Sequence, residues 1–356
     1  MQKLLAKYNI KPRRIAVAVS GGADSLALVF MAKEQLTVFG YEIVALTVNH
    51  GLRPAAENEA RYVAQLMQQH GIEHHILTWS GEKPDTGIEE AARMARYGLL
   101  FDWCKQNGVD VLMTAHHLLD QAETFLIRLQ RGSGLEGLCC MREVSRREGL
   151  FIVRPLLYTN PEVMKKYLTE RGIDWVQDES NEDKRYLRNK IRAFLPLLAA
   201  ETEITPADLA ATAQRLQSAE DYIESQTEAV VQNQIDTLWG VVSSFKYTDF
   251  LQWHPEIKFR VLSGLCRRQY IPRAERVFHA LKQMEKLPFT GLTLGEKELF
   301  SAYGRIWVVP ELHAKRKPSR EEWEKFVAAN PQYKKIKVPH KARVAILKVW
   351  KSDNDL

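Results

Sequence analysis

The stretch RRIAVAVSGGADSLALVFMAKE (13–34) decides the fold. Its apolar run over 13–19 predicts a buried strand, and the spacing of apolar residues over 24–39 predicts a helix. A strand that passes through small residues directly into a helix leaves backbone N–H groups free at the helix N-terminus, where the helix dipole favours an anion. The stretch therefore predicts the start of an α/β sheet with an anion-binding loop.

The loop itself favours a phosphate as the anion. Gly21 and Gly22 allow the backbone to turn tightly and to approach a ligand, and Ser20 and Ser25 add hydroxyl donors. Neither G-x-x-x-x-G-K-[ST] nor G-x-G-x-x-G is present. Asp24 is an acid inside an anion site, which makes chemical sense if a divalent cation bridges it to phosphate. A helix N-cap with a tight turn is the alternative interpretation.

The strand–helix alternation continues along the chain to residue 130. Strands are expected at YEIVALTVN (41–49), 73–79 and 109–115, and helices at 56–70, 88–107 and 119–130. This alternation predicts a parallel, doubly wound α/β sheet, in which ligands bind at the carboxyl ends of the strands. The stretches that follow predicted strands are SGGADS (20–25), NHGLR (49–53) and AHH (115–117).

The 356 residues are enough for two domains and a small third segment. We expect a catalytic domain over 1–200, a mainly helical domain over 201–310 and a basic segment over 311–356. The chain has no 18-residue apolar run and its N-terminus lacks the features of a secretory signal, which predicts a cytoplasmic protein without membrane contact. Four scattered cysteines favour a reducing compartment and argue against a disulfide framework or a zinc ribbon.

Charge is distributed unevenly along the chain. Residues 251–356 hold 22 Lys and Arg against 11 Asp and Glu, whereas residues 201–250 hold 2 against 9. The asymmetry favours a polyanion bound to the C-terminal third, with a solvated basic surface as the alternative. The expected contacts with nucleic acid are Arg267, Arg268, Arg273, Arg276, Lys334 and Lys335. Most aromatic side chains interleaved with them are expected to pack in a core.

Two further groups of charged residues have a spacing that suits chemistry. Arg93 and Arg96 lie three apart on a predicted helix and so share a face that suits a phosphate or an adenylated group. Asp120 and Glu123 lie one helical turn apart and suit Mg²⁺ or a lysine ammonium. Solvated helix faces and favourable first-turn charge are the alternatives.

The motif S-G-G-x-D-S after an apolar strand resembles the PP-loop of the N-type ATP pyrophosphatases, which cleave ATP between its α- and β-phosphates. Within that superfamily, residues 13–198 resemble the tRNA(Ile)-lysidine synthases in the order and spacing of further stretches. These are VNHGLRPAAENEA (48–60), GIEEAARMARYGLL (87–100), TAHHLLDQAET (114–124), RGSGLEGL (131–138), RPLL (154–157) and DESNEDKRYLRNKIR (178–192).

The resemblance implies a two-step reaction that uses ATP and Mg²⁺. The O2 atom of the first cytidine in the CAU anticodon of tRNA(Ile) attacks the α-phosphate, and pyrophosphate leaves. The ε-amine of free L-lysine then attacks C2 and expels AMP, which gives lysidine and changes decoding from AUG to AUA. Positive groups must offset the charge that develops on the phosphoryl oxygens, and the base must leave the anticodon stack.

The resemblance also implies roles for individual residues. The implied ATP-binding residues are Ser20, Gly21, Gly22, Ala23, Asp24, Ser25, His50, Gly51 and His116. The implied catalytic residues are Asp24, Arg93, Arg96, Asp120, Glu123 and Arg188. Asp24 and Asp120 are the implied ligands of Mg²⁺, and Arg192 is the implied contact with tRNA in this part of the chain.

One departure from the family pattern keeps other functions open. Leu119 stands where these enzymes usually carry the first of two adjacent acids. A tRNA thiolase would need catalytic or cluster-binding cysteines, and a GMP or NAD synthetase would need no basic C-terminal third. An RNA-binding protein with an inactive ATP site is a third alternative, which Leu119 favours and the intact SGGADS opposes. The sequence leaves the oligomeric state open, a homodimer included.

Overall fold

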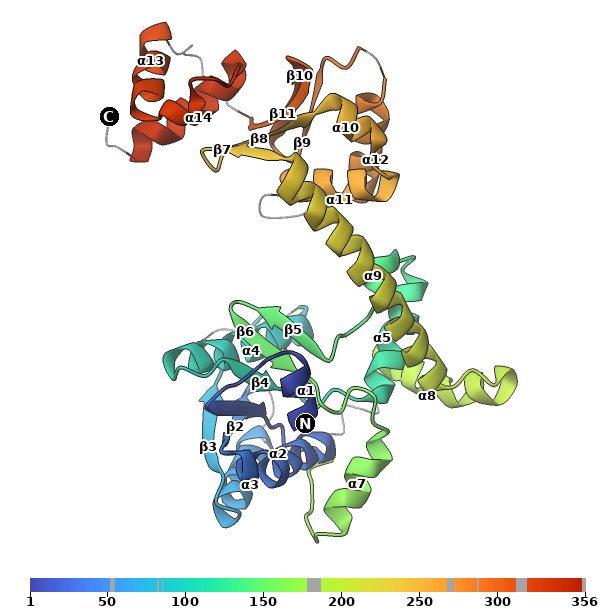
Figure 1. Cartoon of the computed structure of the whole chain (residues 1–356). Coiled ribbons are helices and arrows are strands. Elements are labelled where there is room, and N and C mark those ends of the chain that lie inside the picture. The colour runs from blue at the N-terminus through green and yellow to red at the C-terminus, as the bar shows by residue number, and fades with distance from the viewer. Residues whose placement is uncertain are drawn as a thin grey trace. The chain divides into compact units, whose positions relative to one another are not determined.

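The structure, a computed structural model, describes all residues except 52–54, 82, 85, 178–186, 268–271, 287, 312–318 and 354–356 (Figure 1). The chain forms two compact units, Met1–Glu220 and Asp221–Leu356. The division falls inside the long helix α9 (Pro206–Gln234), which the sequence-based boundary assigns wholly to the second domain. The first half of α9 belongs with the first unit because Leu209 and Ala213 pack into its core.

The first unit is built on a six-stranded sheet with the order β3-β2-β1-β4-β6-β5. Every neighbouring pair is parallel except β5 and β6, which are antiparallel. The strands are β1 (Arg14–Ala18), β2 (Glu42–Asn49), β3 (Glu73–Thr78), β4 (Val111–Met113), β5 (Val144–Arg147) and β6 (Leu150–Val153). The predicted parallel, doubly wound sheet is confirmed, and the β5–β6 hairpin extends it by two strands that the sequence analysis does not predict.

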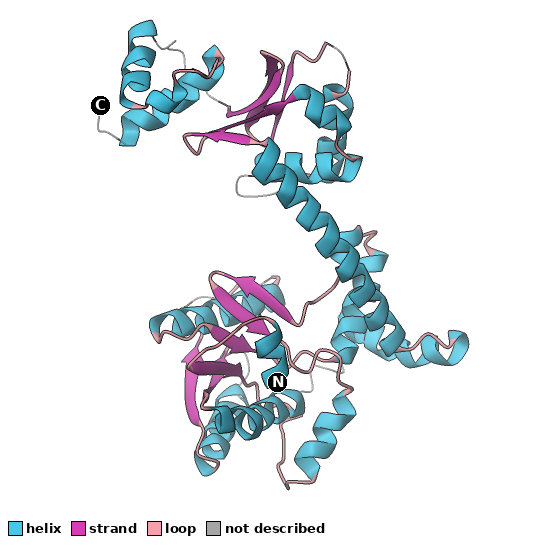
Figure 2. Ribbon diagram, in the orientation of Figure 1, coloured by secondary structure: helices cyan, strands magenta, loops and turns pink. Residues whose placement is uncertain are grey.

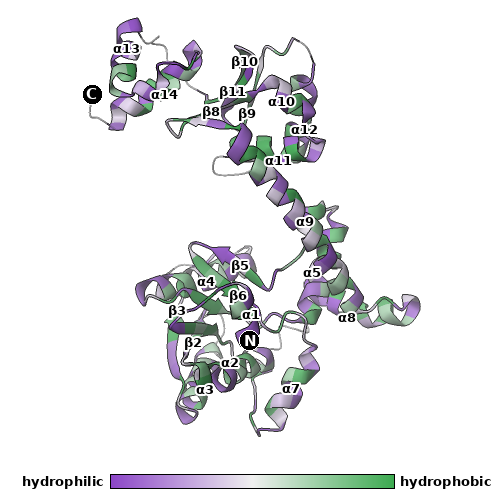
Figure 3. Ribbon diagram, in the orientation of Figure 1, coloured by the Kyte–Doolittle hydropathy of each residue, from purple (hydrophilic) through white to green (hydrophobic). Residues whose placement is uncertain are grey.

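Helices cover both faces of this sheet (Figures 1 and 2). The helical segments of this unit are α1 (Gln2–Lys7), α2 (Ala23–Leu36), η1 (Thr37–Phe39), α3 (Ala55–Gln69), α4 (Ile88–Gln106), α5 (Leu118–Gln130), α6 (Leu135–Leu138), α7 (Pro161–Thr169) and α8 (Leu187–Thr202). Successive strand residues point to opposite faces: Ile15 and Val17 pack in a core with α2, α3 and α7, whereas Ala16 packs with α4. Colouring by hydropathy shows the same apolar strands (Figure 3).

The second unit has a five-stranded antiparallel sheet with the order β7-β8-β11-β10-β9. Its strands are β7 (Asp236–Leu238), β8 (Val242–Lys246), β9 (Gly291–Leu294), β10 (Lys297–Ala302) and β11 (Arg305–Pro310). Its helical segments after α9 are α10 (Tyr247–Gln252), α11 (Pro255–Leu265), α12 (Ala274–Met284), α13 (Arg320–Ala329), η3 (Pro331–Tyr333) and α14 (His340–Asp353). None of the described helices of the chain is long and apolar enough to cross a bilayer.

Alternating residues of β11 connect the two cores of this unit. Ile306 and Val308 pack with α10, α11 and α12, whereas Trp307 and Val309 pack with α13, η3 and α14. Phe326 and Tyr333 are buried in the second of these cores, as the sequence analysis expects for most of the C-terminal aromatic residues. The basic C-terminal segment therefore folds as a layer of this unit in its described part.

Candidate active site

The loop Ser20–Ser25 connects β1 to α2 at the carboxyl edge of the first sheet. Ser25 Oγ donates to the carbonyl of Gly22 at 2.9 Å and accepts from the amide of Ser20 at 3.1 Å. Gly22 is the N-cap residue of α2 and has no side chain to cap the first amides of that helix. The loop thus presents backbone N–H groups and two hydroxyls at a helix N-terminus, as an anion site requires.

A cavity of about 910 Å³ lies over this loop. It brings together most of the residues that the sequence analysis selects, among them Ser20, Asp24, Ser25, His50, Arg96, His116, Asp120, Arg188 and Arg192. Leu119 also contributes to the wall, so the position that lacks the expected acid faces the same space. These residues come from five segments that are far apart in the sequence.

Arg93 and Glu123 are not among the residues that line this cavity. The side chain of Arg93 is 66% exposed and lies 3.9 Å from the carboxylate of Glu90, which is the solvated alternative weighed above. Arg96 lines the cavity, and its Nε lies 3.4 Å from Nε2 of His50. The two arginines of this helix therefore occupy different environments despite their spacing.

His117 lies between two acidic residues of the site. Its Nε2 lies 3.5 Å from Oδ2 of Asp24 and 3.5 Å from Oδ2 of Asp120. Burial acts to lower the pKa of His117, but the neighbouring carboxylates outweigh it and raise that pKa above its usual value. Burial acts to raise the pKa of Asp120, but His117, His116 and Arg188 outweigh it and lower that pKa. The ring of His117 thus lies between two carboxylates beside the phosphate loop, and these carboxylates favour its protonated form.

The donor atoms near Asp24 fit a divalent cation. Oδ1 of Asp24 is buried and has no hydrogen-bond partner among the described residues. A buried carboxylate oxygen without a donor is costly, and a cation bound with phosphate would satisfy it. Asp120 is engaged more fully, because its Oδ2 accepts from the amide of His117 at 2.9 Å. No group of three His, Cys, Asp or Glu forms a metal site by itself in the described part of the chain.

Two histidines that line the cavity are held neutral near pH 7. Burial lowers the pKa of His116 to about 4, and its Nδ1 lies 3.0 Å from the hydroxyl of Thr114. Burial, with Arg96 and Lys83, lowers the pKa of His50 to about 4. Sequence reasoning selects His116 of the AHH stretch, whereas the ring that contacts the carboxylates belongs to His117.

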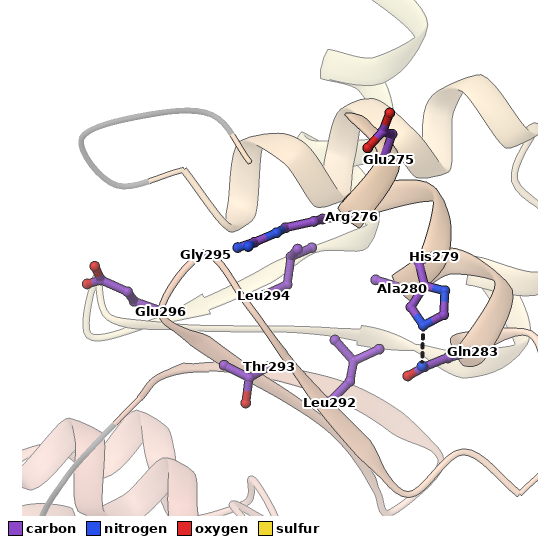
Figure 4. A pocket seen from close by; sticks show the side chains of 10 residues that line it. All are labelled: Glu275, Arg276, His279, Ala280, Gln283, Leu292, Thr293, Leu294, Gly295 and Glu296. Carbon is purple, nitrogen blue, oxygen red and sulfur yellow. Dashed lines mark hydrogen bonds between the residues drawn. The ribbon is translucent and has the colours of Figure 1, made fainter. Parts of the chain in front are cut away.

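The residues that we expect to contact nucleic acid belong to the second unit. Arg267, Arg273, Arg276, Lys334 and Lys335 are exposed, and Arg268 lies outside the described residues. Arg276 lines a second cavity of about 960 Å³ between α12 and the turn after β9, where its side chain extends toward Gly295 (Figure 4). His279 and Gln283 follow it along the same helix, 2.8 Å apart. This wall combines Arg276 with the acids Glu275 and Glu296, so it is of mixed charge.

The four cysteines have no partner in a disulfide. Cys104, Cys139 and Cys266 are buried, and Cys140 is partly buried. Burial raises the pKa of the Cys104, Cys140 and Cys266 thiols to about 12. These thiols are therefore protonated at neutral pH, which does not suit a nucleophile or a cluster ligand.

Comparison with known proteins agrees with the geometry. The family model described as the PP-loop domain matches residues 1–198. The chain is similar to a tRNA(Ile)-lysidine synthase from Bradyrhizobium diazoefficiens, with 37% identity over 73% of this chain and 74% of that protein. It is also similar to one from Bradyrhizobium sp. (strain BTAi1), with 46% identity over 59% of each chain.

The similarity covers only part of the length of some relatives. The chain covers 59% and 63% of the length of the relatives from Bradyrhizobium sp. and Zymomonas mobilis. Among solved structures it is similar in fold to the U34-tRNA thiolase NcsA from Methanococcus maripaludis, with a TM-score of 0.52 and 16% identity. That match covers 60% of this chain and 76% of the thiolase.

Proposed function

The chain belongs to the tRNA(Ile)-lysidine synthase family of PP-loop proteins, and on this basis we propose that it is the ligase that joins L-lysine to tRNA(Ile). The bond forms at C2 of the first cytidine of the CAU anticodon. The observation that carries the proposal is one cavity that combines the Ser20–Ser25 loop and Asp24 with the cations Arg96, Arg188 and Arg192. Phosphate donors and guanidinium groups around one cavity suit the binding of a nucleotide and the transfer of its phosphoryl group.

In the first step, the cytidine O2 attacks the α-phosphate of ATP and pyrophosphate leaves with the electrons of the α–β bridge. The loop amides and the Ser20 and Ser25 hydroxyls are placed to hold the phosphates. Negative charge develops on the transferred phosphoryl oxygens, and the guanidinium groups of Arg96, Arg188 and Arg192 offset it. Nε2 of His117 lies 3.5 Å from Oδ2 of Asp24, so its ring faces the carboxylate beside these phosphates.

Magnesium fits this step through Asp24, whose buried Oδ1 lacks a donor among the described residues. When bound, Mg²⁺ neutralises phosphate charge and orients the leaving group. Asp120 is the second ligand expected from the sequence and stays a prediction. Its contacts with His117 and Arg188 would compete with a metal.

In the second step, the ε-amine of lysine attacks C2 and AMP leaves with the former O2 atom. Adenylation makes this step feasible because it turns a poor leaving oxygen into part of AMP. The amine attacks in its neutral form, so the ammonium loses a proton before the carbon–nitrogen bond is complete. Carboxylates on the cavity wall, Asp24 and Asp120, attract the ammonium to this space.

The alternatives have less support. A thiolase needs a reactive sulfur, and the raised thiol pKa of Cys104, Cys140 and Cys266 opposes that role. An inactive RNA-binding protein is favoured by Leu119 in the wall but opposed by the intact phosphate loop. A cytoplasmic location belongs to the same proposal, since the substrate is a tRNA. A homodimer stays a prediction.

The test is an incubation of the full chain with ATP, Mg²⁺, labelled L-lysine and a tRNA(Ile) transcript with the CAU anticodon. We expect label in the tRNA that depends on ATP, and a fall of about 100-fold or more for Asp24→Ala. The matched control is Asp102→Asn, which changes an exposed acid on α4 and should leave the rate unchanged.

Three results would separate the alternatives. Pyrophosphate release without transfer of lysine would retain the PP-loop chemistry and reject the substrate. Binding of tRNA with neither product would favour the inactive binder, and Leu119→Asp would then be expected to restore pyrophosphate release. Sulfur transfer into the tRNA from a supplied persulfide would favour the thiolase and reject the proposal.

A further inference from the structure

The spacing of Glu123 from Asp120 predicts a ligand of Mg²⁺ or of lysine, but the structure places Glu123 elsewhere. Its side chain has no exposed surface, although it sits one turn after Asp120 on α5. A carboxylate without exposed surface cannot touch free lysine, a metal or a base in the cavity. Its charge is instead balanced within the protein, as a buried carboxylate requires.

Two arginines from α8 supply that balance. Nε of Arg188 donates to Oε2 of Glu123 at 2.7 Å, and Nε of Arg192 donates to Oε1 at 2.6 Å. Each carboxylate oxygen therefore has its own guanidinium. The two arginines lie at i and i+4, so one face of α8 is held against α5 at this point. The packing of Leu195 with Ala122 and Phe125 continues the same contact.

Glu123 accepts a hydrogen bond from one nitrogen, Nε, of each guanidinium. Each guanidinium carries further N–H donors on its terminal nitrogens. The side chains of Arg188 and Arg192 are 46% and 36% exposed, and both line the 910 Å³ cavity. Nη2 of Arg188 also lies 3.6 Å from Oδ1 of Asp120.

These contacts continue to the phosphate loop. Asp120 faces His117, and His117 faces Asp24, at 3.5 Å in each case. Close contacts thus run from Glu123 through Arg188, Asp120 and His117 to Asp24. Arg188 is held by the buried Glu123 and is connected through Asp120 and His117 to the Ser20–Ser25 loop.

We propose that Glu123 is a positioning residue, which orients Arg188 and Arg192 as a paired clamp for a phosphoryl group bound in the cavity that Ser20 and Ser25 also line. This inference rests on the proposed function for the identity of the phosphoryl donor, ATP. The clamp takes a phosphoryl oxyanion, which belongs either to pyrophosphate or to the adenylate. Planar guanidinium groups match such oxyanions by paired hydrogen bonds.

The test measures binding alone, so it does not depend on lysidine formation. Inorganic pyrophosphate, AMP and L-lysine are titrated separately into the full chain by calorimetry in the presence of Mg²⁺. We expect Glu123→Gln to lower the affinity for pyrophosphate or AMP by about tenfold, the effect of losing a charged hydrogen bond. The affinity for L-lysine should stay within about twofold. Whichever of the two ligands loses affinity shows which phosphoryl group the clamp binds. Glu148→Gln, which breaks the exterior 2.8 Å pair with Lys105, is the matched control and should change none.

Arg192→Lys provides a second route that keeps a cation beside Glu123. It should preserve the melting temperature and lower the affinity for the same ligand by about tenfold. An ammonium lacks the planar set of donors with which a guanidinium can contact Glu123 and an oxyanion at once. The double variant Glu123→Gln/Arg192→Lys should bind within about threefold of Glu123→Gln, since that variant already loses the orientation of Arg192.

Two results would overturn the proposal. One is a Glu123→Gln variant that folds and binds both phosphoryl ligands with unchanged affinity. The other is weaker binding of L-lysine with the phosphoryl ligands unaffected, which would make Glu123 a direct ligand of the amino acid. Failure of the wild-type chain to form lysidine would reject the proposed function but would leave these binding results intact. If Glu123→Gln does not fold, Arg192→Lys decides alone.

Discussion

The backbone amide of Val176 donates a hydrogen bond of 2.9 Å to the carbonyl of Gly21. This contact joins the phosphate loop to a segment that follows α7, more than a hundred residues later in the chain. Gly21 has φ of +89°, a left-handed conformation in which residues with a Cβ are strained. The loop is therefore shaped by a tertiary contact as well as by its own sequence.

Gly21→Ala is expected to destabilise the protein by about 2 kcal/mol and to lower its affinity for ATP. A Cβ at this position would lie 3.1 Å from Cγ2 of Val63 and 3.3 Å from Cγ2 of Val176. Relief of that crowding would separate the loop from Val176. Chemical denaturation measures the free energy of unfolding, and calorimetry measures the affinity for ATP.

Gly22→Ala is the matched control for this prediction. Gly22 has φ of −74°, and among the described residues the one atom near an added Cβ is Ser20 Oγ at 3.7 Å. We expect its stability to stay within about 1 kcal/mol of the wild type. Equal destabilisation by the two substitutions would show that the left-handed backbone and the Val176 contact do not set the cost.

The lowered pKa of His74 leads us to expect a loss of stability in mild acid. Burial lowers its pKa to about 4, and its Nε2 contacts the hydroxyl of Thr47 at 2.8 Å. In the unfolded chain the pKa is near 6.5, so between these values unfolding takes up a proton. The contribution of His74 to stability is thus complete above pH 6.5 and falls as the pH is lowered toward 4.

The variant His74→Gln should lessen this acid sensitivity by about 1 kcal/mol, a value reduced to allow for solvent screening. Thermal unfolding of both proteins at pH 7.5 and pH 4.5 gives the comparison. His340→Gln, which changes an exposed histidine at the start of α14, should leave the acid sensitivity unchanged. Parallel pH curves for wild type and His74→Gln would contradict the assignment.

The thiols are expected to react slowly in the native protein. A pKa of about 12 for Cys104, Cys140 and Cys266 leaves almost no thiolate at pH 8, and burial restricts access. Alkylation with iodoacetamide, followed by mass spectrometry, should be at least about 100-fold slower than in denaturant. Rapid labelling of Cys139 or Cys140 in the folded protein would reopen the thiolase alternative.

The strongly periodic part of the first unit could be predicted from the sequence. The helices expected at 56–70, 88–107 and 119–130 correspond to α3, α4 and α5, and the strand at 73–79 corresponds to β3. The β5–β6 hairpin was missed because β6 is four residues long and follows the charged turn at 146–149. In the second unit the sequence predicts a mainly helical domain, whereas the structure also has a five-stranded sheet, whose strands of three to six residues carry little periodicity.

The site was predicted where its chemistry is local and missed where it is tertiary. Ser20–Ser25 carries its function in one contiguous loop, so the sequence suffices. The burial of Glu123 depends on Arg188 and Arg192, which lie 65 and 69 residues further along the chain. Spacing on one helix placed Arg93 beside Arg96, yet packing directs only Arg96 into the cavity. Such differences arise from which face of a helix is covered, and a single sequence does not encode that directly.

The basic residues of the second unit predict a salt-dependent affinity for tRNA. Removal of residues 311–356 is not a clean test, because Phe326, Val338 and Ile346 belong to the core beneath the sheet. The double variant Lys334→Gln/Lys335→Gln changes two exposed cations and keeps that core. We expect about three- to tenfold weaker binding at low salt and a slope of log affinity against log salt that is shallower by about one to two.

Filter binding of the tRNA(Ile) transcript between 50 and about 200 mM salt measures both quantities. Lys282→Gln/Lys325→Gln serves as the control, because it removes two other exposed cations of the same unit, on helices α12 and α13. Both variants should keep the wild-type melting temperature, since the four side chains lie outside the apolar cores. An unchanged slope for Lys334→Gln/Lys335→Gln would show that these lysines contact no phosphate, and a shallower slope for the control alone would place the RNA on the other helices.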